Sequence, residues 1–552
     1  MTTMFPSAAV LSILLAAPAA AGPQQPAPAH QHPAGGAAHE QLGSVEFATS
    51  CGAEAVPLFN RAVALLHSFE FGEAIKGFTA TLAQDPSCSM AEWGIAMSRW
   101  GNPFGQGQRA AGPLKEGAAA VARGQALRPK TPREAGYLNA VAVLFADADT
   151  VDQRTRIVRY RDAMATHAAA YSDDVEAQIF YALSIAGAND PADKSYADLL
   201  KAGAILEKLI AGRPQHPGLA HYIIHSYDVP PLADRALAAA RRYATIAPSA
   251  PHALHMPSHT FTRVGSWQES IETNIASANA ARAVGSAAEE LHAMDYQAYA
   301  ALQTAQDGVV RGLIAALPDL QARFNPDAIG GAAPGSAGYF AMASIPARYA
   351  LERGDWKAAA ALVPQTTRFL FPDAQTWFAK AIGAARAGDA AGTRAAIAEL
   401  TRIRDGLTAN KETYWADQAE IQRRTASAWL ALVENRSTEA LVEMRAAADL
   451  EDKTEKAAVT PGPLAPAREL VGEMLLQMGK APEALQAFEA TLAKEPKRFR
   501  ALSGAIRAAT LAGQTDKARQ HAQTLLAICV KADAPARPEL AEAKKLAATA
   551  SR

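Results

Sequence analysis

The chain has 552 residues, a formal net charge of -1, and a hydrophobic content of 49% with only 7% aromatic residues. This length accommodates several ordinary domains or one long array of repeats. The near-neutral charge, with no basic run, excludes the usual electrostatic signature of nucleic-acid binding or of attachment to an anionic membrane. Abundant alanine with few aromatic residues favours closely packed helices over a β-sandwich.

The first residues are typical of a secretory signal. Residues 8–17 form a short apolar core and small residues precede Gly22, so we expect a signal peptide over residues 1–21. The segment lacks the usual basic start, which leaves a cytosolic leader as the alternative. Residues 22–43, rich in Pro, Ala, Gly and His, predict a disordered linker. No other apolar run is long enough to span a membrane, so we expect a periplasmic or secreted protein.

Three cysteines are present, and two of them flank the first expected helical hairpin. Cys51 precedes its first helix and Cys88 follows its second. Because an antiparallel hairpin brings these two ends together, we predict a disulfide between them in an oxidising compartment. Two separate buried thiols are the alternative. Cys529 lies in the apolar run LLAICV and is expected to be a buried thiol.

Helical periodicity dominates after residue 54, and the strongest signal is self-similarity at a period of 34 residues. The segment VGEMLLQMGKAPEALQAFEATLAKEP has the pattern of a tetratricopeptide (TPR) repeat. Gly479 falls at repeat position 15, Ala484 at position 20 and Phe488 at position 24. Near the front of the chain Phe78 also falls at position 24. The sequence therefore predicts an all-α, TPR-like solenoid, a right-handed superhelix of antiparallel helix pairs.

Breaks rich in Pro and Gly, such as residues 325–338, predict loops inserted between the hairpins. We divide the predicted solenoid near residue 340. The N-terminal part, 44–340, contains a stretch dense in histidine. The C-terminal part, 341–552, contains the clearest repeats.

Seven of the thirteen histidines lie within residues 216–292. The repeat numbering places His221 and His225 at positions 5 and 9 of one first helix. His255 and His259 fall at the same positions of the next. A spacing of four puts each pair on one face of its helix. Adjacent first helices lie about 10 Å apart, so we predict that all four imidazoles reach one transition-metal ion.

Further polar residues fall at positions that line the concave face of such repeats. They are additional candidate site residues: His252, His292, Asp228, Asp295 and Tyr299. An aspartate here either binds the ion directly or accepts a hydrogen bond from the second nitrogen of a histidine. Imidazoles beside a carboxylate suit zinc, copper, iron or nickel better than magnesium or calcium. Pro257 lies inside the predicted helix between His255 and His259, where we expect a kink.

Two other interpretations of the histidines stay open: a metal-free binding surface, and ordinary packing. A single histidine on a helix is usually structural, but two pairs in the same repeat register are hard to ascribe to chance. No GxSxG elbow, phosphate loop or CxxC pair offers a competing chemistry.

The pieces HYIIHSYD, HALHMPSHTF, ELHAMDY and TPGPLAPARELVGEML resemble a bacterial group of secreted TPR proteins with an H-M-P-S-H signature. The resemblance covers most of residues 45–530. It implies the repeat fold and names no reaction or substrate. In that group a histidine often precedes T-P-G-P, whereas this chain has Ala457 and Ala458 there, so a contribution from that position is in doubt.

Two function classes follow. The first is a metal-dependent enzyme, an oxidoreductase or a hydrolase, centred on the histidines. The second is a non-catalytic scaffold that binds a peptide, a protein or a small-molecule ligand in the concave groove. A scaffold groove typically presents Asn, Lys and Arg. His, Asp and Tyr at those positions favour the metal site.

Overall fold

The computed structural model describes residues 40–105 and 107–548, together with Met1. The predicted signal peptide lies outside this part of the chain, as does most of the predicted linker. Residues from Gln41 onward belong to one compact unit. Within it, Leu42 is buried and the Gln41 amide donates to Ser249 Oγ at 2.8 Å, so residues 41–43 pack with the helices.

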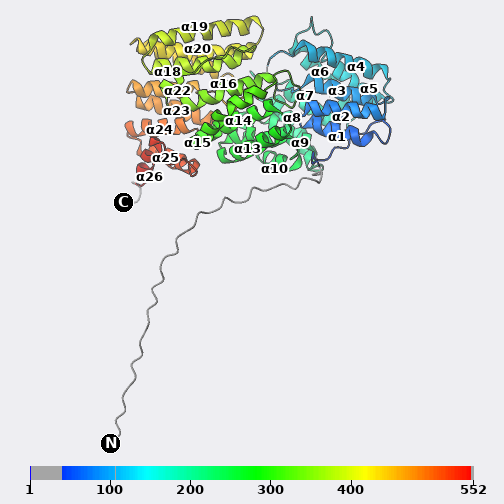
Figure 1. Ribbon diagram of the computed structural model, residues 1–552, viewed down its shortest axis with the longest axis horizontal. Helices are drawn as coiled ribbons and strands as arrows, with labels where there is room; N and C mark the ends of the chain where they lie inside the picture. The colour runs from blue at the N-terminus through cyan, green and yellow to red at the C-terminus, as the bar shows by residue number, and fades with distance from the viewer. Residues whose placement is uncertain (2–39, 106, 549–552) are drawn as a thin grey trace. The chain divides into compact units, whose positions relative to one another are not determined.

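Every regular element in the described residues is helical. In chain order (Figure 1) the elements are α1 Val56–His67, α2 Phe71–Gln84, α3 Ser89–Trp100, α4 Ala111–Ala126, α5 Pro132–Ala142, α6 Gln153–Ala170, α7 Val175–Gly187, α8 Ala197–Ile210, α9 Pro217–Ser226, the 3-10 helix η1 Pro230–Ala236, α10 Leu237–Ile246, α11 Pro251–His255, α12 Pro257–Val264, α13 Trp267–Ala283, α14 Ala287–Gln303, α15 Asp307–Arg323, α16 Gly335–Glu352, α17 Trp356–Ala361, α18 Leu370–Arg386, α19 Ala390–Ala409, α20 Thr413–Val433, α21 Ser437–Glu451, α22 Ala467–Gln477, α23 Ala481–Lys494, α24 Phe499–Leu511, α25 Thr515–Ile528 and α26 Pro538–Ala548. None of these helices combines the length and apolar character that crossing a membrane requires.

The helices are arranged in two layers. Each helix packs against the next to form a hairpin, as α1 does with α2, α7 with α8 and α22 with α23. The first helix of a hairpin also packs beside the first helix of the following one, as in the pairs α1–α3, α7–α9, α14–α16 and α22–α24. This alternation is the arrangement of a TPR-like solenoid, and it confirms the predicted all-α fold.

The aromatic residue at repeat position 24 fixes how closely successive hairpins approach. Phe488 is buried, and a Cβ on Gly504 would lie only 2.4 Å from its ring. Phe78 is related in the same way to Gly94, the same number of residues further on, where a Cβ would lie 2.3 Å from the ring. A glycine at this position therefore admits the aromatic ring at both ends of the chain.

Repeat position 15 is a turn residue in the left-handed conformation. Gly479 has φ 73° and Gly265 has φ 68°, which glycine adopts without a steric cost. Two other turns place larger residues there, Phe69 and Ala305, both with φ 55°. A phenylalanine is rare in this region and is kept there by its surroundings. The ring of Phe69 packs against histidines of the site described below.

The kink expected at Pro257 is a break between two short helices. α11 ends at His255 and α12 begins at Pro257. The backbone continues through bonds from Met256 N to His252 O at 2.9 Å and from His259 N to Met256 O at 3.1 Å. Proline has no backbone N–H, so the hydrogen bond at this residue is already missing. The change of direction therefore breaks no additional one.

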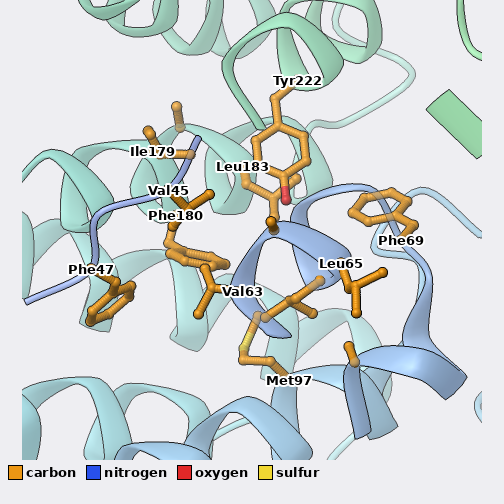
Figure 2. Packing of buried hydrophobic residues seen from close by; sticks show 14 of the residues in the cluster. Val45, Phe47, Val63, Leu65, Phe69, Met97, Ile179, Phe180, Leu183 and Tyr222 are labelled. Carbon is orange, nitrogen blue, oxygen red and sulfur yellow. The ribbon is translucent and has the colours of Figure 1, made fainter. Parts of the chain in front are cut away.

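Helices distant in sequence also meet. α1 packs against α9, and α14 packs against α24. Figure 2 shows the buried cluster around the first contact, where Leu65 of α1, Met97 of α3, Phe180 of α7 and Tyr222 of α9 lie close together. The contact between α1 and α9 brings the end of α1 and the turn after it, with His67 and Phe69, to the first of the histidine-bearing helices.

Cys51 and Cys88 form a disulfide, which ties the segment before α1 to the residue that precedes α3. Cys529 is a buried free thiol, as expected. Residue 340, where the sequence analysis divides the solenoid, lies inside α16. Ala341 of this helix packs in a buried cluster with α13 and α14, and Leu351 packs in a cluster with the C-terminal helices.

The close approach of Phe488 predicts that Gly504→Ala lowers the stability of the protein. The added methyl group overlaps a buried ring, and overpacking of this kind costs about 1–3 kcal/mol. Gly312→Ala is the matched control, because Gly312 lies inside α15 with open space around its Cα. We expect it to raise stability by roughly 0.5–1 kcal/mol through helix propensity. Thermal unfolding of both variants measures the two effects, and equal midpoints would contradict this packing account.

Candidate metal centre

Six histidines from neighbouring first helices form one buried cluster. α9 carries His221 and His225, α11 carries His252 and His255, α12 carries His259, and α14 carries His292. Each is at most 6% exposed. The repeat register predicts these residues on a concave surface, and the chain's own segments bury them there.

The cluster is divided into two groups of three. His221, His225 and His252 form the first triad, and His255, His259 and His292 form the second triad. Within each triad one ring nitrogen from every histidine lies within 4.8 Å of those of the other two. The repeat register predicts one ion shared by the two helical pairs. Instead, each pair is completed by a histidine from the following hairpin.

In the first triad several ring nitrogens lack partners. His221 Nδ1 donates to the backbone carbonyl oxygen of His67 at 2.6 Å, which leaves a lone pair on its Nε2. The Nε2 atoms of His221, His225 and His252 are all buried without a hydrogen-bond partner among the described residues. The ring centroid of His221 lies 4.9 Å from that of His225 and 5.1 Å from that of His252.

In the second triad two lone pairs face each other. His255 Nδ1 donates to Asn274 Oδ1 at 2.8 Å, and His259 Nδ1 donates to Asp228 Oδ2 at 2.9 Å. The Asn274 amide is oriented by a bond from its Nδ2 to Ser270 O. With both protons on Nδ1, the two Nε2 atoms meet at 3.1 Å as acceptors. Histidines that share a metal ion have this arrangement, with the outer nitrogen held by an oxygen.

One aromatic ring packs against all three histidines of each triad. Phe69 contacts the first triad, with its centroid 4.4 Å from that of His221 and 5.7 Å from that of His252. Tyr296 contacts the second triad, 4.9 Å from His259 and stacked on it. The rings exclude water from one side of the triads and limit the orientations that the imidazoles can adopt.

Burial keeps the imidazoles neutral. It lowers the pKa of His259 to about 4, with a further contribution from the Lys456 cation, and it lowers the pKa of His292 to about 3. The pKa values of His221, His225 and His255 also lie well below the usual value. Burial is the largest cause in each case, and neighbouring histidines lower the pKa further. For His255 the main neighbour is His292. The neutral ring is the form that binds metals.

Asp228 orients His259 and is not itself in either triad. Its carboxylate also accepts from Arg263 Nε at 2.9 Å and from Lys456 Nζ at 2.8 Å. Burial alone would raise the pKa of Asp228, but the two cations outweigh burial and hold it well below the usual value. Of the two roles that the sequence left open for an aspartate, the geometry is that of a partner to the second histidine nitrogen.

Asp295 and Tyr299 belong to neither triad and are bonded to arginines. Asp295 accepts from Arg348 Nε at 2.9 Å, and Tyr299 bonds with Arg498 at 3.3 Å. Arg348 in turn donates to the carbonyl oxygens of Gly462 and Pro463, so Asp295 acts on the loop that follows α21.

That loop, residues 453–466, covers the second triad. The Tyr296 hydroxyl lies within hydrogen-bond distance of Ala458 O at 2.9 Å and Thr460 O at 3.0 Å. Lys456, from the same loop, is the buried cation beside Asp228. The loop contains the T-P-G-P segment noted in the sequence.

A cavity of about 550 Å³ adjoins both triads. Its wall includes His225 and His252 from the first triad and His259 and His292 from the second. Ala457 and Ala458 also line it, so the position at which the resembling group often has a histidine faces this cavity. Pockets of this size commonly hold a small organic ligand.

A third group, the Glu176 bridge, consists of His67, Glu176 and His216. The Glu176 oxygens lie 2.9 Å from His67 Nε2 and 3.0 Å from His216 Nε2. Both carboxylate oxygens are therefore already occupied by imidazole nitrogens, and His67 Nδ1 is bonded to Tyr222 at 3.0 Å. The bridge fixes His67, whose carbonyl orients His221.

Sequence reasoning did not identify Phe69, Tyr296, Asn274, Lys456 or the Glu176 bridge. Tyr296 follows Asp295 directly in the ELHAMDY segment, so an aromatic ring next to a candidate ligand was a usable signal. The others reach the site through contacts between hairpins distant in sequence or between the two helix layers, which the repeat pattern does not specify.

No protein-family model matches the chain, and no curated protein matches it. Among solved structures, the TPR domain of P58(IPK) is 14% identical, with 69% of this chain and 99% of that chain covered and a TM-score of 0.21. Yeast Tom70 is 11% identical, with 90% and 96% covered and a TM-score of 0.28. A monomeric mutant of IFIT1 with Gppp-AAAA is 10% identical, with 86% and 95% covered and a TM-score of 0.36. The resemblance to secreted bacterial proteins stays a prediction.

The lowered pKa of His292 predicts a pH-dependent stability of the metal-free protein. The unfolded ring binds a proton below pH about 6.5, and the folded ring only below about 3. The contribution of the neutral ring to stability is complete above pH 6.5 and is lost as the pH falls from 6.5 towards 3, at most about 1.4 kcal/mol per pH unit. Chemical denaturation between pH 7 and 4 should show a shallower dependence for His292→Gln than for the wild type. His521→Gln, on α25, is the control and should keep the wild-type slope. Equal slopes for all three proteins would contradict a buried neutral His292.

Proposed function

We propose that the protein binds a transition-metal ion at the second triad and uses it on a small molecule held in the adjoining cavity. The observation that carries the proposal is the 3.1 Å separation of His255 Nε2 and His259 Nε2, with both Nδ1 protons already donated to oxygen. Two buried lone pairs placed in this way repel each other, and neither accepts a hydrogen bond. A cation between them and His292 removes that cost.

Each buried acceptor without a partner costs about 1–3 kcal/mol. Three neutral imidazoles give nitrogen donors only, which suits zinc, copper or iron, whereas magnesium and calcium take oxygen ligands. Three protein ligands also leave a coordination position open, and catalytic sites keep such a position for substrate or water.

The cavity gives the proposed ion access to a ligand. His259 and His292 form part of the cavity wall, as do the aromatic rings of Phe71, Phe371 and Trp415. An ion bound here would supply Lewis-acid or redox chemistry. The chain's own residues do the rest: the rings provide an apolar surface for the ligand, and Asp228 holds His259 in the required tautomer.

The cavity also contains a cation. Arg109 lines it and has no carboxylate partner among the described residues, and burial lowers its pKa to about 10. Its guanidinium lies over the Trp100 ring at 5.2 Å. A guanidinium beside apolar walls favours a small organic anion as the ligand.

We place this function outside the cytoplasm. The apolar N-terminal segment supports export, and the Cys51–Cys88 disulfide suits an oxidising compartment. The alternative, a scaffold that holds a peptide in the groove, is typical of such repeats. Here the groove positions occupied by the six histidines are buried under the chain's own segments, so a peptide would have to bind elsewhere.

Elemental analysis of the purified, untagged protein tests the proposal. We expect close to stoichiometric zinc, copper or iron in the wild type and loss of the second-triad ion in His259→Ala. Asp228→Asn should weaken affinity by about 10–100-fold, because removing an outer partner misorients the ligand without deleting it. His521→Ala is the matched control and should keep the metal. A folded wild type without metal after growth in supplemented medium would refute the proposal.

A further inference from the structure

The two triads are the same ligand set repeated once along the solenoid. The first triad takes positions 5 and 9 of α9 and position 2 of the following first helix, where His252 lies. The second triad takes positions 5 and 9 of the next first helix and position 2 of α14, where His292 lies. The same repeat positions therefore supply both ligand sets, in adjacent repeats.

The repetition is limited to two copies. In α14 the residues at positions 5 and 9 are Asp295 and Tyr299, and both are bonded to arginines away from the cavity. The preceding first helix, α7 (Val175–Gly187), carries no histidine. Neither neighbouring repeat offers a histidine at this position, so the ligand array consists of two sets.

The two triads adjoin each other closely enough to act together. The ring centroids of His225 and His259 are 5.8 Å apart, and those of His252 and His255 are also 5.8 Å apart. Each triad contributes two histidines to the wall of the same 550 Å³ cavity. Ions held by the two triads would therefore lie next to each other along the same cavity wall, and one ligand in the cavity would bind both.

The first triad shares with the second its buried ring nitrogens, although only His221 has its tautomer fixed by a hydrogen bond. Three Nε2 atoms are buried without partners, and His221 Nε2 must carry a lone pair because Nδ1 is the donor. Glu289 Oε2 is also buried without a hydrogen-bond partner in the described residues, and it lies 3.8 Å from His252 Nδ1. Glu289 is therefore a buried carboxylate beside His252, but the two make no hydrogen bond like the one between Asp228 and His259.

We propose that the first triad binds a second ion, so that the six histidines form a two-metal centre with three imidazoles on each ion. The inference rests on the proposed function. Copper is the ion to test, because an all-imidazole ligand set suits it and it stands highest in the order of divalent affinities. No carboxylate belongs to either triad, so two adjacent cations need an anion between them. The open positions face the cavity, where a bridging hydroxide or a small anion such as azide would lie.

The experiment loads the full-length, metal-free protein with Cu²⁺, removes unbound ions, and measures copper content together with the electron paramagnetic resonance signal. We expect about two copper ions per chain and a signal far below that of two independent ions, because bridged Cu²⁺ ions couple magnetically. His221→Gln with His252→Gln should retain about one ion with a full single-copper signal. His259→Gln with His292→Gln should do the same at the first triad. Circular dichroism establishes that each variant is folded.

One copper ion in the wild type that is lost only in the second-triad variant would overturn the two-metal centre and leave the proposed function intact. Two ions with an uncoupled signal would overturn the shared ligand. No bound copper here, together with no metal in the elemental analysis of the purified protein, would overturn both proposals. If a double variant fails to fold, X-ray absorption on the wild type replaces it: a copper–copper distance of about 3.5–4 Å supports the inference, and its absence contradicts it.

Discussion

The site depends on hydrogen bonds that fix the outer nitrogen of the histidines. His221 donates Nδ1–H to a backbone carbonyl, His255 to an amide and His259 to a carboxylate. Each bond selects one tautomer and one ring orientation, and directs Nε2 towards the interior of the cluster. Without these bonds the same residues would be buried polar groups in a helical core, free to satisfy one another.

The repeat architecture supplies the partners from two directions. Within a hairpin, the second helix α13 presents Asn274 to His255 of the first layer. Between distant hairpins, the packing of α1 against α9 brings the His67 carbonyl and the strained Phe69 to the first triad. The loop over residues 453–466 is bound by Tyr296 and Arg348 and closes the groove above the second triad. A groove that such folds normally leave open is here partly covered by the chain's own segments.

The sequence was sufficient for the local geometry. A period of 34 residues established the helical hairpins, the glycine turns and the alignment of His221 with His255, and the spacing of four placed His225 and His259 on the same faces. It was not sufficient for the grouping of ligands. The pairs separate into two triads because His252 groups with the pair on α9, and His292 groups with the pair on α11 and α12. The Glu176 bridge and Lys456 were also beyond prediction, because their contacts cross many repeats.

Anomalous diffraction from copper-loaded crystals tests the central claim most directly. The account predicts two strong peaks at the copper edge, one inside each triad, each about 2.0–2.1 Å from three imidazole nitrogens. Diffraction data on metal-free crystals provide the reference. Peaks confined to surface histidines such as His521, with both triads empty, would contradict the account. The buried histidines would then belong to the packing of the solenoid.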